Sequence, residues 1–123
     1  MVTTIDGKIT GDFLTTDKGS ALADEYYHIH RSYAADTYLC GRMTFEGSFT
    51  FGRKPDTKNM TDIIEENGDY VFGKFEKYAV VIDTHGRLGW NSNIIHDKDP
   101  GYDNAHIIEV VTEQTPKAYL VKL

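Results

Sequence analysis

The amino-acid sequence predicts an α/β fold with a mixed, mostly parallel sheet flanked by helices. A stretch with helical periodicity at residues 22–33 is followed directly by a short β-rich run at 36–40, and helix-then-strand order is typical of such sheets. A second run, 78–82, is apolar throughout, as in strands that are covered on both faces. With 123 residues, the chain has the length of one domain, and we expect residues 1–123 to form it.

The other elements are predicted from local patterns. Residues 1–5 are β-prone and precede a sharp turn at Asp6 and Gly7. Ser20 is the expected N-cap of the helix, whose apolar side chains share one face and are Leu22, Tyr26, Ile29 and Tyr33. Glycines and a proline interrupt residues 44–78, where only 60–66 are expected to be helical. Residues 106–111 and 118–123 have strand character.

Composition excludes several classes of protein. A content of 40% hydrophobic and 26% charged residues is typical of a globular chain that folds. The net charge of −6, with no cluster of basic residues to offset it, argues against a nucleic-acid partner. No apolar run approaches the ~18 residues of a membrane span, and the N-terminus lacks a signal-peptide pattern. The single Cys40 excludes an internal disulfide and favours a reducing, cytoplasmic setting.

The turn that follows the 36–40 strand could bind a phosphate. Gly41 allows a ligand to approach the backbone, the N–H groups after it and the Thr44 hydroxyl can donate hydrogen bonds, and Arg42 supplies positive charge. The same residues are compatible with an ordinary strand-to-helix turn whose arginine is solvated. The turn alone does not decide between these readings.

Four blocks of sequence occur in an order that is typical of a known family. The blocks are residues 3–9, 30–31, 35–44 and 80–88. Together they resemble the C-terminal reductase domain of the bifunctional riboflavin-biosynthesis deaminase/reductase, a branch of the dihydrofolate-reductase-like superfamily. The resemblance runs from Thr3 to Leu123 and covers the N-terminal portion of that domain.

The resemblance implies an NADPH-dependent oxidoreductase similar to 5-amino-6-(5-phosphoribosylamino)uracil reductase. Hydride would pass from NADPH to a small heterocyclic or sugar-linked substrate. The residues that it assigns to the cofactor are Val2, Thr3, Gly41, Arg42, Thr44, Thr84 and Arg87. Among these, Thr84 would meet the phosphate on the adenosine side, and Arg87 would favour NADP over NAD by contacting the extra phosphate.

The resemblance also assigns a catalytic and a substrate residue. Asp6 would lie near the reacting centre, where it would orient a polar substrate group or help to deliver a proton. Arg31 lies close to the position that holds the substrate's phosphate in the family. A plain Asp-Gly turn and a solvated arginine at position 87 are the alternatives.

Two departures from the family pattern suggest other functions. The segment 45–49 and the long insertion after it replace the short acidic segment that the riboflavin enzymes use for their substrate. The family's further strand, Gly-Gly phosphate turn, helix and hairpin are expected beyond Leu123. The alternatives are therefore a truncated or diverged non-catalytic fragment that self-associates, and a reductase of dihydrofolate-like pterins.

The expected partners are a small-molecule substrate and a second copy of the chain in a homodimer, with no membrane. An open sheet edge near Leu123 would invite pairing with that copy. No metal is expected, because His28 and His30 point to different helix faces and no cysteine or carboxylate stands at zinc-type spacing from them.

Overall fold

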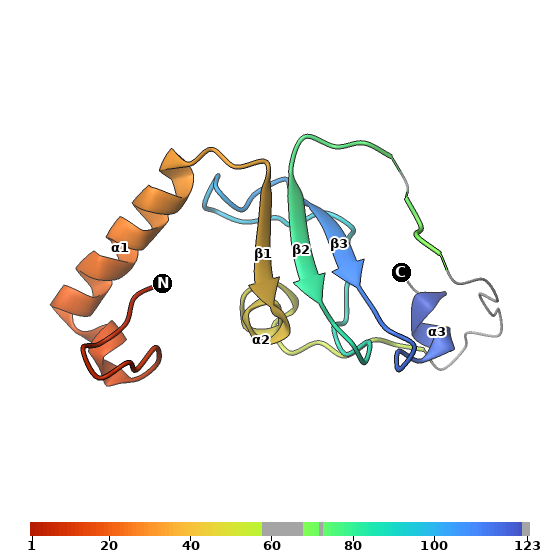
Figure 1. Cartoon of the computed structure of the whole chain (residues 1–123), viewed down its shortest axis with the longest axis horizontal. Coiled ribbons are helices and arrows are strands. Elements are labelled where there is room, and N and C mark those ends of the chain that lie inside the picture. Colours follow the sequence, from red (N-terminus) through yellow and green to blue (C-terminus); the bar gives the residue numbers. More distant parts are fainter. Residues whose placement is uncertain (58–67, 72, 122–123) are drawn as a thin grey trace. The chain divides into compact units, whose positions relative to one another are not determined.

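The computed structural model describes residues 1–57, 68–71 and 73–121. It divides into two compact units, Met1–Ala35 and Asp36–Leu123 (Figure 1). The helix expected at 60–66 lies outside the described residues. No helix in the described part of the chain is both long enough and apolar enough to cross a membrane.

The first unit contains the 3₁₀ helix η1, Asp12–Thr15, and the helix α1, Asp17–Ser32. The expected cap is wrong, because the side chain of Thr16, not that of Ser20, accepts the hydrogen bond from the N–H of Gly19 at 3.1 Å. An Oγ atom at this position satisfies one of the free N–H groups in the first turn. The helix therefore begins three residues before Ser20.

The N-terminal segment does not form the expected strand. Its backbone groups bond within the turn, since the N–H of Thr4 donates to the carbonyl of Lys8 and the N–H of Gly7 donates to the carbonyl of Thr4, each at 3.0 Å. Gly7 has a φ of 81°, which places it in the left-handed region that glycine favours. The predicted Asp-Gly turn is thus present without a strand before it.

The second unit contains a three-stranded parallel sheet in the order β1-β2-β3 (Figure 1). The strands are β1, Thr37–Gly41, β2, Tyr78–Ile82, and β3, His106–Val110. The sequence predicts all three strands to within about one residue. This sheet, together with the helices, confirms the α/β class.

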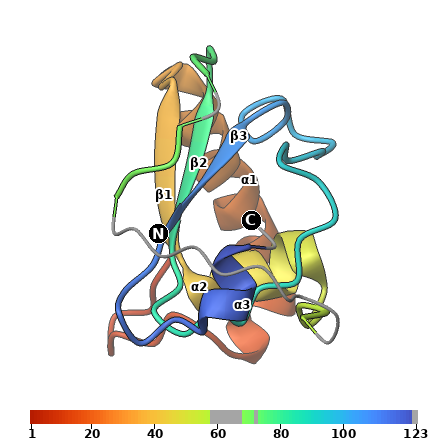
Figure 2. The ribbon, with the colours of Figure 1, turned by 90° about the vertical axis from the view of Figure 1, so that its right-hand side faces the viewer.

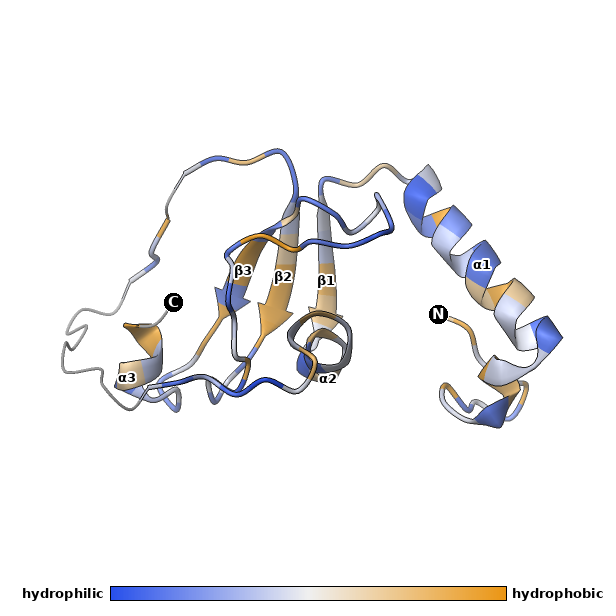
Figure 3. Cartoon of the chain, turned by 180° about the vertical axis from the view of Figure 1, so that it is seen from behind, coloured by the Kyte–Doolittle hydropathy of each residue, from blue (hydrophilic) through white to orange (hydrophobic). Residues whose placement is uncertain are grey.

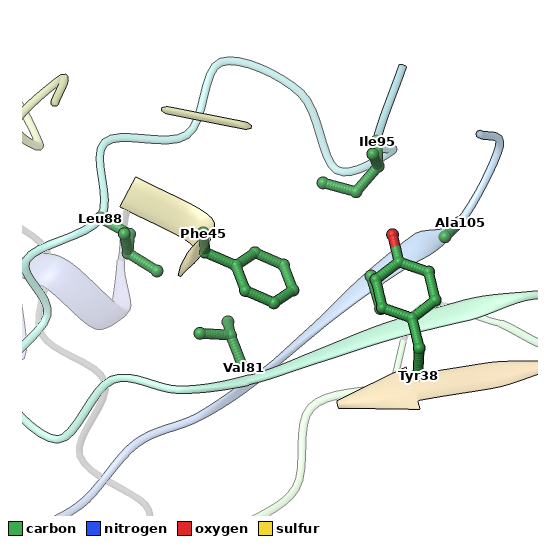
Figure 4. Close-up of a cluster of buried hydrophobic side chains, with 7 residues drawn as sticks. Tyr38, Phe45, Val81, Leu88, Ile95 and Ala105 are labelled. Atoms are coloured by element: carbon green, nitrogen blue, oxygen red, sulfur yellow. The ribbon is translucent and has the colours of Figure 1, made fainter. Parts of the chain in front are cut away.

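One face of the sheet carries the hydrophobic core. The helical segment that follows β1 consists of α2, Arg42–Phe45, and the π-helical η2, Glu46–Thr50. Phe45 of α2 is fully buried and points toward Val81 of β2 (Figure 4). The other buried members of the core are Tyr38, Ala79, Leu88, Ile95 and Ala105.

Apolar side chains on the opposite face of the sheet are exposed. The strand register places Leu39, Val80 and Ile108 side by side on this face, and Leu39 is 62% exposed. Ile82 and Val110 follow two residues later and are also exposed. Figure 3 shows that β2 is hydrophobic over most of its length, toward the arrowhead.

The last element is a helix rather than the expected strand. The short helix α3, Lys117–Leu120, follows Pro116, and the N–H of Tyr119 donates to the carbonyl of Pro116 at 2.8 Å. The side chain of Tyr119 is 1% exposed, so burial of this ring fixes the segment. Strand propensity has no effect here, because no described strand pairs with these residues.

Candidate functional site

Three turns meet at the carboxyl edge of the sheet. Because β1, β2 and β3 are parallel and in register, the segments 41–44, 83–88 and 111–115 all begin at this edge. Figures 1 and 2 show α2 and α3 near the same end of the sheet. Ligands of open α/β sheets bind outside the carboxyl ends of the strands, so this edge is the candidate site.

In the turn after β1, the backbone at Gly41 has free space beside it. A Cβ atom added to Gly41 would meet nothing within 4 Å, and Thr44 is exposed. Arg42, however, forms an ion pair with Glu46, which also binds Lys54 at 2.6 Å. The hydrogen bonds from Lys54 and Arg42 lower the pKa of Glu46. The charge of Arg42 is therefore partly neutralised by the Glu46 carboxylate, four residues further along the chain.

The turn after β2 is fixed by a buried aspartate. Asp83 is 1% exposed, and its Oδ2 accepts hydrogen bonds from the N–H groups of Arg87 at 2.5 Å and Leu88 at 2.9 Å. The N–H of Gly86 donates to the Asp83 carbonyl at 3.2 Å. The positions of Thr84 and Arg87 thus depend on the Asp83 carboxylate.

Thr84 joins the turn after β2 to the turn after β3. Its carbonyl accepts hydrogen bonds from the hydroxyls of Thr112 at 3.0 Å and Thr115 at 3.1 Å, and its own Oγ1 lies 2.7 Å from Nδ1 of His85. Thr84, Thr112, Glu113 and Gln114 line a pocket of about 300 Å³. This pocket brings a predicted cofactor residue together with three residues from the next turn.

Sequence reasoning missed Thr112, Glu113 and Gln114. The sequence could have indicated them, because they begin two residues after Val110, the last residue of β3, and the turns after parallel strands meet at one edge. Arg87 belongs to the same edge and its side chain is exposed.

The other predicted site residues belong to the first unit. Asp6 is exposed, accepts a hydrogen bond from the Thr4 hydroxyl at 2.5 Å and forms an ion pair with Lys8 at 2.9 Å. The hydrogen bonds from Thr4 and Lys8 lower the pKa of Asp6, so this group is a carboxylate at neutral pH. The Thr3 hydroxyl donates to the Lys8 carbonyl at 3.2 Å.

Two further predicted residues lie in the same unit. Val2 is half-buried near the start of the chain. Arg31 is exposed in the last turn of α1. The structure thus places Val2, Thr3, Asp6 and Arg31 in one unit and the remaining predicted residues in the other.

A cluster of polar groups lies beneath the turn after β2. Glu109 of β3 accepts hydrogen bonds from Trp90 Nε1 at 2.7 Å and from the Tyr119 hydroxyl at 2.6 Å. Burial raises the pKa of Glu109 to about 7, and the charge of Asp83 acts in the same direction. Burial and then the contact with Glu109 also raise the pKa of Tyr119.

The remaining observations concern metals and similarity. Within residues 1–57, 68–71 and 73–121, no group of three or more histidine, cysteine, aspartate or glutamate side chains could hold a metal ion. Comparison with protein-family models, curated proteins and solved structures found no match to this chain. The fold and the site define an α/β protein with an open pocket, lined by Thr84 and residues 112–114, at the carboxyl edge of a parallel sheet.

Proposed function

We propose that the chain binds NADPH at the carboxyl edge of its sheet and acts as a reductase. The observation that carries this proposal is the pocket between Thr84 and the segment 112–114, at the edge where α/β sheets bind nucleotides. The Thr84 hydroxyl and the Gln114 amide of this pocket can donate to phosphate oxygens, whereas the Thr112 hydroxyl already donates to the Thr84 carbonyl. The open backbone at Gly41 offers a further approach to the same ligand.

This edge carries both positive and negative side chains, and we propose that they contact different parts of the cofactor. Arg87 is exposed on the turn after β2 and would contact the phosphate that distinguishes NADP from NAD. Glu113 would repel a phosphate but can accept hydrogen bonds from ribose hydroxyls. Arg42, held by Glu46, would contribute less positive charge than its sequence position suggests.

The proposed reaction is hydride transfer to a small heterocyclic or sugar-linked substrate, of the 5-amino-6-(5-phosphoribosylamino)uracil reductase type. The cofactor supplies the hydride, and the protein orients the reacting groups. Asp6 would act as a hydrogen-bond acceptor for a polar substrate group, because its pKa is lowered and it carries no proton to donate at neutral pH. Arg31 would bind a phosphate on that substrate.

Replacing Thr84 with valine tests the cofactor site. Valine keeps the shape of threonine but removes the hydroxyl, so the Thr84→Val variant is expected to bind NADPH about 10-fold more weakly, as for loss of one hydrogen bond to a charged group. Binding is measured by isothermal titration calorimetry and by the shift in melting temperature with NADPH. The carbonyl of Thr84, which accepts from Thr112 and Thr115, is unchanged.

The control is Thr10→Val, at an exposed threonine outside the pocket. This variant should bind NADPH as the unmodified chain does. The proposal fails if the unmodified chain shows no binding or stabilisation by NADPH, or if both variants bind equally well.

We also propose that two copies of the chain associate through the exposed apolar face of the sheet. Parallel sheets are usually covered on both faces, and within the unit Asp36–Leu123 the side chains of Leu39, Ile108 and Val110 leave one face apolar and exposed. Light scattering after size exclusion is expected to give twice the chain mass of 13.9 kDa. Ile108→Lys should give the single-chain mass, whereas Ile9→Lys, in the other unit, should leave the mass unchanged.

A further inference from the structure

The cluster around Glu109 contains more hydrogen-bond acceptors than donors. The single proton of the Tyr119 hydroxyl lies within reach of two acceptors, the Leu88 carbonyl at 2.9 Å and Glu109 Oε1 at 2.6 Å. In addition, Oδ1 of Asp83 is buried and receives no hydrogen bond from the described residues. Buried acceptors without a donor are costly.

Two donors are missing from this cluster, and one added proton supplies one of them. If Glu109 carries it on Oε1, the carboxyl group can donate to Tyr119, whose own proton is then free for the Leu88 carbonyl. Asp83 lies beside this end of β3, because its N–H donates to the carbonyl of Val110, the residue after Glu109, at 3.0 Å. If the proton points to Asp83, it satisfies the buried Oδ1 atom. The Trp90 N–H continues to donate to Oε2 of Glu109 in either arrangement.

We propose that the buried Asp83 and the half-buried Glu109 form a carboxyl pair that holds one proton, and that this proton holds the turn after β2 and helix α3 against β3. Asp83 and Glu109 are thereby positioning residues for the pocket at Thr84. The effect on cofactor binding rests on the proposed function, whereas the shared proton does not.

The charges that face Glu109 support a single proton in this cluster. The titratable groups near it in the described residues are Asp83 from the turn after β2 and Tyr119 from α3, and neither is a cation. Two carboxylates in one site disfavour each other's ionised form. Trp90 and Tyr119 stabilise the charge of Glu109, but burial and Asp83 outweigh them.

The carboxyl pair of Asp83 and Glu109 is linked directly to the pocket at Thr84. Asp83 holds the N–H groups of Arg87 and Leu88 through its Oδ2, and Thr84 is the next residue in the chain. When Glu109 loses its proton, repulsion between the two carboxylates acts on the residue that fixes this turn. The affinity of the pocket for its ligand should then fall as the pH rises through the pKa of Glu109.

Trp90 reports on this proton, because it is the only tryptophan in the chain and its indole N–H donates to Glu109. The fluorescence emission of the full chain, recorded without nucleotide, is expected to titrate with a midpoint of about 7. Glu109→Gln should abolish this transition. Asp83→Asn should lower its midpoint by about one pH unit, because it removes the neighbouring charge.

Glu109→Gln and Asp83→Asn both keep a hydrogen-bonding group at the substituted position. The matched control is Glu76→Gln, at an exposed site in the same unit, which should leave the fluorescence transition unchanged. Carbon-13 NMR of glutamate carboxyl groups in the unmodified chain provides a second readout, with one carboxyl expected to titrate near neutral pH. The proposal is overturned if Glu109→Gln retains the fluorescence transition, if Asp83→Asn does not lower the midpoint, or if no glutamate carboxyl titrates near neutrality.

The same samples separate this inference from the proposed function. A fluorescence transition with no NADPH binding at any pH would leave the shared proton in place and remove the reductase proposal. NADPH binding without a fluorescence transition would remove the shared proton and leave the reductase proposal in place. If the unmodified chain shows both the fluorescence transition and NADPH binding, its affinity for NADPH should fall as the pH rises. The affinity of Glu109→Gln should then stay constant over the same pH range.

Discussion

Substitution of Gly86 with alanine is expected to lower the free energy of unfolding by about 3 kcal/mol. The residue has a φ of 62°, a left-handed conformation that costs an alanine roughly 1 kcal/mol. An added Cβ would also lie 2.6 Å from two ring atoms of Tyr119 and 3.1 Å from Cγ2 of Thr115. Overpacking of this kind costs about 1–3 kcal/mol.

The Tyr119 ring cannot move away from this contact without breaking other interactions. It is 1% exposed, and its hydroxyl bonds to Leu88 and Glu109. Urea unfolding followed by circular dichroism measures the effect, which should appear as a lower midpoint with an unchanged slope. The Gly86→Ala change therefore tests whether α3 packs against the turn after β2.

Gly47→Ala is the matched control for this prediction. Position 47 lies in the helical segment η2, and a Cβ there would meet nothing within 4 Å. Alanine is favoured over glycine in helices by about 1 kcal/mol, so this variant should be as stable as the unmodified chain or more so. Equal stability of the two variants would contradict the described packing of Tyr119.

Raising the pH from about 4.5 to about 7 is expected to remove on the order of 3 kcal/mol of stability through Glu109. The pKa of Glu109 is raised from 4.5 to about 7 in the folded chain. Between these values the unfolded chain releases this proton while the folded chain retains it, so the free energy of unfolding falls as the pH rises. The contribution is complete below pH 4.5 and is lost above about 7.

Other titratable groups make the free energy of unfolding rise with pH. Their contributions cancel when the unmodified chain is compared with the Glu109→Gln variant. Burial lowers the pKa of His106, which stabilises the folded chain as the pH rises through the histidine range. The lowered pKa values of Asp6 and Glu46 act only at more acidic pH. Urea unfolding at a series of pH values should therefore show the Glu109 contribution as the difference between the unmodified chain and Glu109→Gln.

The Glu76→Gln variant serves again as the control. It removes one exposed carboxylate and should preserve the pH dependence of the unmodified chain. A Glu109→Gln variant whose stability falls with pH as steeply as that of the unmodified chain would show that Glu109 does not carry the proton.

Local sequence was sufficient to predict the strands and the helix that are marked by a run or a periodic spacing of apolar residues. The apolar runs at β1, β2 and β3 are bounded by Gly41, Asp83 and a polar segment, and such runs form strands when they can pair in a sheet. The apolar periodicity predicted α1, although its cap at Thr16 was missed. Part of the candidate site followed as well, because Gly41 and Thr84 stand directly at or after strand ends.

Tertiary contacts decided the features that join distant parts of the sequence. The segment after Pro116 had strand propensity but became α3, because the Tyr119 ring is buried beside Gly86. Glu109 meets Trp90 and Tyr119, which are 19 and 10 residues away, and the pKa of Glu109 depends on that burial. Sequence patterns report short-range periodicity, whereas desolvation and charge pairing depend on which residues the fold brings together.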